Sequence, residues 1–305
     1  MDKPQARMPR LVCLGHSSVD AIYGVPAIPS TPMKVLASSY REAGGGMASN
    51  ASVAAARLGA GVEYWGRVGD DASGSQILAW LEAEGVDTQH VRRIPGARSP
   101  RTAVLVDAAG ERLICGYNDP ALDDDPSWLP VESLADCGAV LADVRWRIGA
   151  TRVLDAARSL NVPSVLDADI APVESLLDLC ARCDYAIFSH GGLERASGVP
   201  DPGAGLRRMR AMGRGLVGVT LGEDGFLWLE DGAERRAPGQ RVSVVDTLAA
   251  GDVFHAAFAL GIAERKPVAE AARFANAAAA LKCTRPGGRS GAPTRREVEA
   301  LLSRP

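Results

Sequence analysis

The chain has 305 residues, 47% of them hydrophobic and 23% charged, and a net charge of −3. These values are typical of a globular protein with a sizeable core, and they give no electrostatic basis for general nucleic-acid binding. No apolar run approaches the ~18 residues that a membrane span needs, and residues 1–7 lack the apolar stretch of a signal peptide. We therefore expect a cytoplasmic protein with one large domain, or one plus a small appendage.

The first third of the chain begins with a strand and then breaks into extended segments. Residues 11–15 are apolar and predict a short buried strand. Residues 16–43 alternate polar and apolar residues between prolines, and residues 94–118 indicate two strands joined by a turn at 107–110. Both segments predict a small β layer that projects from a larger core.

The rest of the chain alternates strands and helices. Apolar runs at 139–142, 164–167, 185–188 and 215–220 predict strands, and residues 149–160, 172–180 and 203–212 have helical patterns. This alternation is typical of a parallel α/β sheet, which binds ligands at the carboxyl ends of its strands. We expect an α/β core formed by 11–15, 44–93 and 119–305, and a discontinuous β lid formed by 16–43 and 94–118.

A glycine run at 44–46 precedes a predicted helix over 51–58. Three glycines permit close backbone contact with a polar ligand, and the Asn50 side chain is placed to hydrogen-bond it; a flexible connection is the alternative. The chain has no G-x-G-x-x-G after a strand and no G-x-x-x-x-G-K-[ST]. A dinucleotide-binding fold is therefore disfavoured, and a P-loop enzyme is excluded.

The segment 246–252 reads Asp-Thr-Leu-Ala-Ala-Gly-Asp and leads into an apolar helix over 253–264. Small residues before a helix let backbone N–H groups approach an anion, and the helix dipole adds positive charge there. The carboxylate of Asp252 at that point suits a base that takes a proton from an attacking hydroxyl. An N-cap on a core helix is the alternative. Thr220, Gly222 and Gly225, after the predicted strand 215–220, suit nucleotide phosphates or ribose, or simply turn the chain.

These three clusters, in this order, resemble the signatures of the PfkB (ribokinase-like) carbohydrate kinases over residues 11–300. The first signature matches Gly45, Gly46 and Asn50 with 54–60 and 66–71, the second, D-T-x-G-A-G-D, matches 246–252, and the closing segment matches 274–277 and 284–287. The resemblance implies a ribokinase-like three-layer parallel-sheet core with a small β-sheet lid. It also implies transfer of the ATP γ-phosphoryl group to a sugar hydroxyl.

The resemblance assigns roles to individual residues of this chain. Asp252 would be the base, and the amides of Ala250, Gly251 and Asp252 would form the anion hole. The sugar would be held by Asp20, Gly45, Gly46 and Asn50, and ATP by Thr220, Gly222, Gly225, Asn276 and Gly287. Mg²⁺ would bind through the phosphates, a monovalent cation such as K⁺ is a further expected cofactor, and exposed lid edges suggest a homodimer.

Two departures from the family pattern matter. Ala249 stands where the family has a glycine, which is harmless at negative φ and damaging at positive φ. The N-x-x-E pattern that organises Mg²⁺ falls on Ser189 and Gly192. This implies either that Mg²⁺ is held mainly through ATP and water or that activity is weak.

Within the family, residues 140–146 and 281–289 resemble the bacterial sulfofructose kinases. Arg145, just after a predicted strand, is placed to grip a sulfonate or phosphate bidentately, and Lys34 in the lid would add positive charge. Gly116 stands where an asparagine is expected. We expect an ATP-dependent kinase for a ketose such as 6-deoxy-6-sulfofructose. A neutral ketohexose, ribose or a nucleoside is the alternative substrate, and a catalytically weak sugar- or nucleotide-binding regulator is the alternative of another class.

Overall fold

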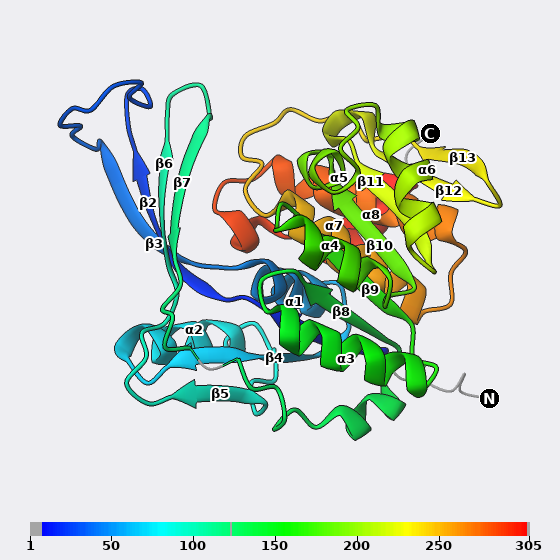
Figure 1. Cartoon of the computed structure of the whole chain (residues 1–305). Coiled ribbons are helices and arrows are strands. Elements are labelled where there is room, and N and C mark those ends of the chain that lie inside the picture. The colour runs from blue at the N-terminus through cyan, green and yellow to red at the C-terminus, as the bar shows by residue number, and fades with distance from the viewer. Residues whose placement is uncertain (1–7, 123, 304–305) are drawn as a thin grey trace, which may run out of the picture.

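The computed structural model describes residues 8–122 and 124–303, which form a nine-stranded sheet covered by helices and a separate four-stranded sheet (Figure 1). Residues 1–7, for which we expect no signal peptide, lie outside the described residues. Within the described ranges, no helix combines the length and apolar character needed to cross a bilayer.

The nine-stranded sheet is parallel except at one edge. Its order is β13-β12-β11-β10-β9-β8-β1-β4-β5, and the pairs β11–β12 and β12–β13 are antiparallel while the other pairs are parallel. The strands expected from the apolar runs are all present, which confirms the α/β prediction. The nine are β1 (Arg10–Gly15), β4 (Gly61–Gly69), β5 (Val91–Ile94), β8 (Ala139–Asp143), β9 (Ser164–Ala168), β10 (Tyr185–Ser189), β11 (Leu216–Thr220), β12 (Phe226–Glu230) and β13 (Ala233–Ala237).

Helices cover both faces of this sheet, so the core has the three layers that were predicted. Each face has its own apolar core: Phe258 and Val253 lie in one, and Leu154 and Leu176 lie in the other. The first face carries α1 (Met47–Arg57), α2 (Ala72–Glu82), α7 (Ala250–Ala263), α8 (Val268–Cys283) and α9 (Arg295–Leu302). The second carries α3 (Arg147–Ser159), α4 (Val173–Cys180), α5 (His190–Ser197) and α6 (Pro202–Met212).

Two of these helices begin earlier than the apolar pattern indicates. The helix predicted from residue 51 begins at Met47, and the one predicted from residue 253 begins at Ala250. The first turns hold small and polar residues that a hydrophobic pattern does not register. In α1 that turn is fixed from outside, because the N–H of Ala48 donates to the Asp143 carboxylate at 3.1 Å.

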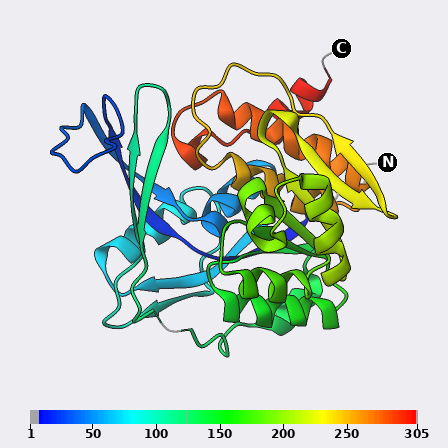
Figure 2. The same ribbon diagram turned by 45° about the horizontal axis from the view of Figure 1, so that its top comes forward.

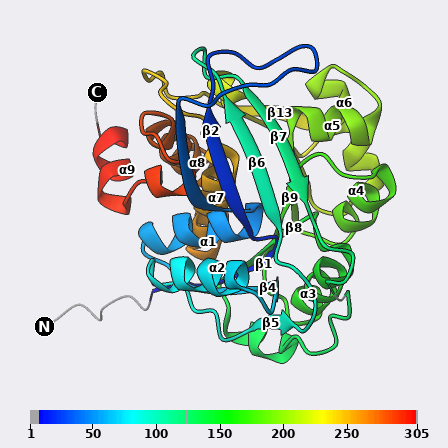
Figure 3. The same cartoon turned by 90° about the vertical axis from the view of Figure 1, so that its left-hand side faces the viewer.

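The four-stranded sheet stands beside the core and is called the lid below (Figures 2 and 3). Its order is β3-β2-β6-β7, with β2–β6 parallel and the outer pairs antiparallel. The lid was expected to comprise 16–43 and 94–118. In the structure, β3 continues beyond residue 43 to Gly45, and Ile94 is the last residue of a strand in the large sheet. The strands are β2 (Ser18–Gly24), β3 (Ser39–Gly45), β6 (Arg101–Val106) and β7 (Arg112–Tyr117).

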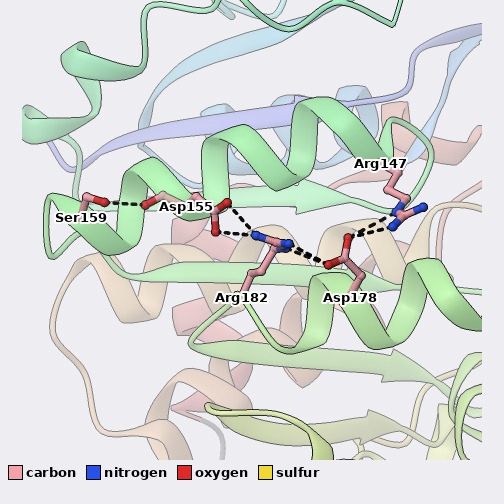
Figure 4. Close-up of polar contacts among 5 residues, drawn as sticks. All are labelled: Arg147, Asp155, Ser159, Asp178 and Arg182. Atoms are coloured by element: carbon pink, nitrogen blue, oxygen red, sulfur yellow. Dashed lines mark hydrogen bonds and ion pairs between the residues drawn. The ribbon is translucent and has the colours of Figure 1, made fainter.

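A chain of ion pairs joins α3 to α4 on the outer surface (Figure 4). Arg182 lies between two carboxylates, 2.6 Å from Asp155 and 2.9 Å from Asp178. Arg147 reaches the same Asp178 from the first turn of α3 at 3.2 Å. Because these residues share partners, the cluster holds the two helices together better than isolated surface pairs would.

Candidate active site

Four of the predicted site residues come together where the carboxyl ends of the parallel strands meet the base of the lid. Asn50 in the first turn of α1 donates to the carboxylate of Asp252 in the first turn of α7, at 2.7 Å. Asp20 on β2 lies against Gly45, where an added Cβ would fall 2.1 Å from its carboxylate oxygens. The lid and two helix N-termini therefore enclose one polar site.

The pair of Asn50 and Asp252 is suited to proton transfer. Burial, with the nearby charge of Asp167, raises the pKa of Asp252 well above its ordinary value, and the amide of Asn50 opposes that shift. In the described part of the chain, the buried Oδ1 of Asn50 has no hydrogen-bond partner. A buried polar atom without a partner is costly, so this oxygen suits a ligand that donates a hydroxyl proton.

Gly45 and Gly46 have packing roles that a flexible connection would not have. Gly45 makes room for Asp20, which accepts a hydrogen bond from Ser18 at 2.6 Å. Gly46 has φ 95°, and an added Cβ would meet the backbone of His16 at 2.5 Å. Burial raises the pKa of Asp20, and its hydrogen bond from Ser18 works against that shift.

Arg289 also belongs to this site, although the sequence pattern assigned it no role. Its side chain is buried and donates to the Ser49 hydroxyl at 3.1 Å. Burial lowers its pKa to about 10, and the negative charges of Glu84 and Asp20 oppose that shift. An added Cβ at Gly44 would fall 1.8 Å from the guanidinium, so the first glycine of the run accommodates this arginine.

Asp143 holds three backbone segments in place around the site. Its carboxylate accepts hydrogen bonds from the N–H groups of His16 (2.7 Å), Ala48 (3.1 Å) and Arg145 (2.8 Å). An added Cβ at Gly15 would fall 2.2 Å from that carboxylate. The sequence pattern did not single out Asp143, but its place directly after an apolar strand is a signal that could have found it.

Two further aspartates lie at the carboxyl end of the neighbouring strand: Asp167 within β9 and Asp169 directly after it. Burial raises the pKa of Asp167 well above its ordinary value, and the charges of Asp169 and Asp143 add to the effect. The carboxylate of Asp167 lies 3.5 Å from the ring of the buried His255. The carboxyl edge of the sheet is therefore strongly acidic behind Asp252.

The anion site is expected at the N-terminus of α7. The N–H of Ala250 donates to the Thr247 carbonyl at 3.2 Å, so one of the three expected amides is engaged. The amides of Gly251 and Asp252 lie in the first turn, where no helical acceptor exists. Ala249 has φ 64° and ψ 10°, which places it in the left-handed region that an alanine adopts at a cost.

A cavity of about 670 Å³ opens beside this helix end. Of the residues assigned to ATP, Thr220, Gly222, Gly225 and Asn276 line it, together with Ala250 and Gly251 of the anion site. The Asn276 amide donates to the carbonyls of Ala237 (2.9 Å) and Pro238 (3.1 Å), so it shapes the wall. Gly287 lies outside the lining residues, and its N–H donates to the Asp246 carboxylate at 2.9 Å.

A second, polar cavity of about 210 Å³ lies below the lid and is lined by Arg145, Arg67 and His16. The Arg145 guanidinium donates to the Ile170 carbonyl at 3.1 Å and lies 3.5 Å from Asp169. An arginine has five N–H donors, so these contacts leave donors for a ligand. Lys34 lies in the exposed connection between β2 and β3 and lines neither cavity.

The two positions that depart from N-x-x-E form the N-cap of α5. The hydroxyl of Ser189 accepts from the N–H of Gly192 at 3.0 Å and donates to Asp169 at 2.8 Å. An added Cβ at Gly192 would fall 2.4 Å from the Ala168 carbonyl. Across the described ranges, no cluster of three or more His, Cys, Asp or Glu side chains is placed to hold a metal ion.

Comparison with known proteins supports the fold described above. The family model for pfkB family carbohydrate kinases matches residues 8–295. The chain is 34% identical over 303 residues to a ribokinase of Bacillus subtilis (strain 168), covering 96% of this chain and 100% of that protein. It is 28% identical to fructokinase-1 of Oryza sativa subsp. japonica, covering 87% and 90%. The structure of Arabidopsis thaliana ribokinase complexed with ribose and ATP superposes with a TM-score of 0.86 at 26% identity, covering 98% and 100%.

Proposed function

The chain belongs to the pfkB family of carbohydrate kinases, and on that premise we propose that it transfers the γ-phosphoryl group of ATP to a hydroxyl of a ketose that carries an anionic group. Family membership makes the chain a phosphotransferase, so the alternative of a regulator is set aside. The relatives reported above are named ribokinase and fructokinase. The proposal of an anionic sugar, such as 6-deoxy-6-sulfofructose, therefore rests on the site alone.

The chemistry assigns one task to each group around Asp252. The sugar hydroxyl oxygen attacks the γ-phosphorus, the bond from that phosphorus to ADP breaks, and the hydroxyl proton passes to the Asp252 carboxylate. The amides of Gly251 and Asp252 stabilise the charge on the transferred group. Asn50 and Asp20 orient the sugar, and the 670 Å³ cavity holds the nucleotide.

The observation that carries the choice of substrate is the polar cavity at Arg145. Two arginines and a histidine line a small space beside the sugar site, together with the carboxylates of Asp119 and Asp124. Arg67 stacks on Trp146 with its guanidinium carbon 4.2 Å from the ring centroid and pairs with Asp124 at 2.7 Å, so it is held in a fixed position. Arginine suits a sulfonate or phosphate because its planar guanidinium presents paired donors.

The acidic edge of the sheet fits the Mg²⁺ that accompanies ATP. In phosphoryl-transfer sites this ion takes one or two carboxylates together with phosphate oxygens and water. Asp169 is a partly exposed carboxylate whose charge reaches Asp252. We assign to Asp169 the role that the N-x-x-E pattern has in the family, which is to organise Mg²⁺. Asp169→Asn is expected to raise the Mg²⁺ concentration for half-maximal activity, and an unchanged requirement would refute the assignment.

The test of the proposed function is Mg²⁺-dependent ADP release with sulfofructose, fructose 6-phosphate, fructose, ribose and a nucleoside. Asp252→Asn should lower turnover by roughly 10²–10⁴-fold. Arg145→Ala should raise KM for the anionic ketoses and leave neutral sugars unaffected. Arg147→Ala is the matched control, since Arg147 is an exposed arginine on the outer surface. Equal rates with neutral and anionic ketoses would refute the anionic substrate.

Ribose is the second candidate substrate, because the relative at 34% identity is a ribokinase. In that case ribose would be turned over best and Arg145→Ala would leave its KM unchanged. The polar cavity would then bind no part of the sugar.

We further propose that a second copy of the chain covers the outer face of the lid. Both β3 and β7 are edge strands, and open edges favour pairing with another chain. Exposed apolar side chains on these strands are Tyr40, Leu113, Ile114 and Tyr117. Sedimentation should show a dimer that Ile114→Lys dissociates and that Ile148→Lys, an equally drastic change at an exposed site on α3, leaves intact. A wild-type monomer would refute this proposal.

A further inference from the structure

Lys282 is a fully buried lysine beside the nucleotide cavity. It lies near the end of α8, and its side chain is 0% exposed. Lysine is almost never buried without a partner. Its Nζ atom donates to the carbonyl of Asp246 at 2.7 Å and lies 3.5 Å from the carboxylate of the same residue. The carbonyl of Arg285 is a third oxygen partner at 3.4 Å.

The surroundings of Nζ require a cation. Three oxygen atoms face a nitrogen that, as a neutral amine, would turn a lone pair toward one of them, whereas an ammonium offers a donor to each. Burial lowers the pKa of Lys282, and the negative charge of Asp246 opposes that shift. Carbonyl and carboxylate oxygens are also the groups that bind K⁺. The lysine therefore occupies an oxygen cluster whose chemistry suits a monovalent ion.

This oxygen cluster joins the two segments that border the phosphate-binding end of the cavity. The Asp246 carboxylate accepts from the N–H of Leu248 at 2.8 Å and from the N–H of Gly287 at 2.9 Å. The N–H groups of Val245 and Asp246 donate to the Cys283 carbonyl at 2.8 and 3.1 Å. A cation at Nζ thus fixes the chain that leads into the first turn of α7.

We propose that the ammonium of Lys282 is a tethered replacement for a monovalent cation, positioning the 246–249 segment so that the enzyme needs no K⁺. The K⁺ expected from the family resemblance does not fit this cluster, because Nζ already fills it. The inference rests on the phosphotransferase activity of the family and is independent of which sugar is used. Lys282 acts through the backbone, and is a positioning residue.

The test compares chloride salts at constant ionic strength, with tetramethylammonium as the inert cation. Wild-type turnover and ADP affinity, the latter measured by calorimetry without any sugar, should be the same in tetramethylammonium, Na⁺ and K⁺. Lys282→Ala opens space in the cluster and should lose about 10–100-fold in ADP affinity and turnover. K⁺ or NH₄⁺ should raise the ADP affinity and the turnover of this variant about tenfold, and should also raise its Tm.

Two further variants keep the result interpretable. Lys282→Met fills the space without a charge, so K⁺ should not rescue it, and Lys266→Ala removes a partly exposed lysine paired with Glu264 and should behave as wild type. Activation of the wild type by K⁺ would overturn the inference. So would a folded Lys282→Ala that keeps full ADP affinity in tetramethylammonium, or one that K⁺ leaves unrestored. A failure of the sugar proposal would leave the calorimetric results unchanged.

Discussion

Ala249 gives a prediction whose sign can be worked out from one backbone angle. It holds φ 64° at the residue before the first turn of α7. An alanine in this region costs roughly 1–2 kcal/mol, while a glycine loses about 0.5–1 kcal/mol more chain entropy on folding. Ala249→Gly should therefore raise the free energy of unfolding by about 0.5–1 kcal/mol, which corresponds to about 1–2 °C in Tm.

The neighbouring alanine provides the control for this prediction. Ala250 is the first residue of α7, so Ala250→Gly makes the same chemical change in a right-handed backbone and should cost about 0.5–1 kcal/mol. Urea titration and thermal unfolding of both variants measure the two effects. Turnover of Ala249→Gly should stay near the wild-type value. If both substitutions destabilise the protein equally, the left-handed alanine is not strained and the reasoning fails.

Three other substitutions test separate parts of the structure. Asp167→Asn removes charge that raises the pKa of Asp252, so the acid limb of the pH–rate profile should move to lower pH; an unmoved limb would mean that Asp252 is not the titrating base. Because the pKa of Asp167 is raised in the folded protein, this carboxyl contributes most to stability at acid pH, and the contribution is lost as the pH rises through that pKa. The Tm of Asp167→Asn relative to wild type should therefore be higher near neutral pH than at acid pH. Gly45→Ala should raise the sugar KM by about 10–100-fold, because the added Cβ would fall 2.1 Å from the Asp20 carboxylate; an unchanged KM would remove Asp20 from the sugar site. Arg182→Ala should lower the unfolding free energy by about 1 kcal/mol with kcat unchanged, and a kinetic effect would contradict its placement on the outer surface.

The parts of the fold that the sequence predicted are those set by hydrophobic burial. Strands buried on both faces are short apolar runs, so the run at 139–142 located β8 to within a residue. The helix starts were missed because their first turns depend on distant groups. Met47 begins α1 beside a carboxylate that the chain supplies almost a hundred residues later, at Asp143.

The site also contains residues that the sequence predicted and residues that it did not. Asp252 and Asn50 stand in motifs, and the structure brings their side chains together. Arg289 and Lys282 were not assigned roles, because a cation in a sequence is indistinguishable from a solvated surface residue until its burial is known. Lys34 was assigned to the substrate from its charge, and in the structure it lies in an exposed connection and lines neither cavity. Which cations are enclosed depends on tertiary packing, and single-sequence patterns do not record it.

The position of β1 in the interior of the sheet has a consequence for how the protein is made. Its residues Leu11–Leu14 are fully buried between β4 and β8. β4 is synthesised about 50 residues after β1, but β8 ends only at Asp143. At about 5–20 residues per second, one edge of the first strand stays unpaired on the ribosome for on the order of 10 s. Nascent chains stalled before residue 139 should therefore bind holdase chaperones more strongly than the full-length chain does.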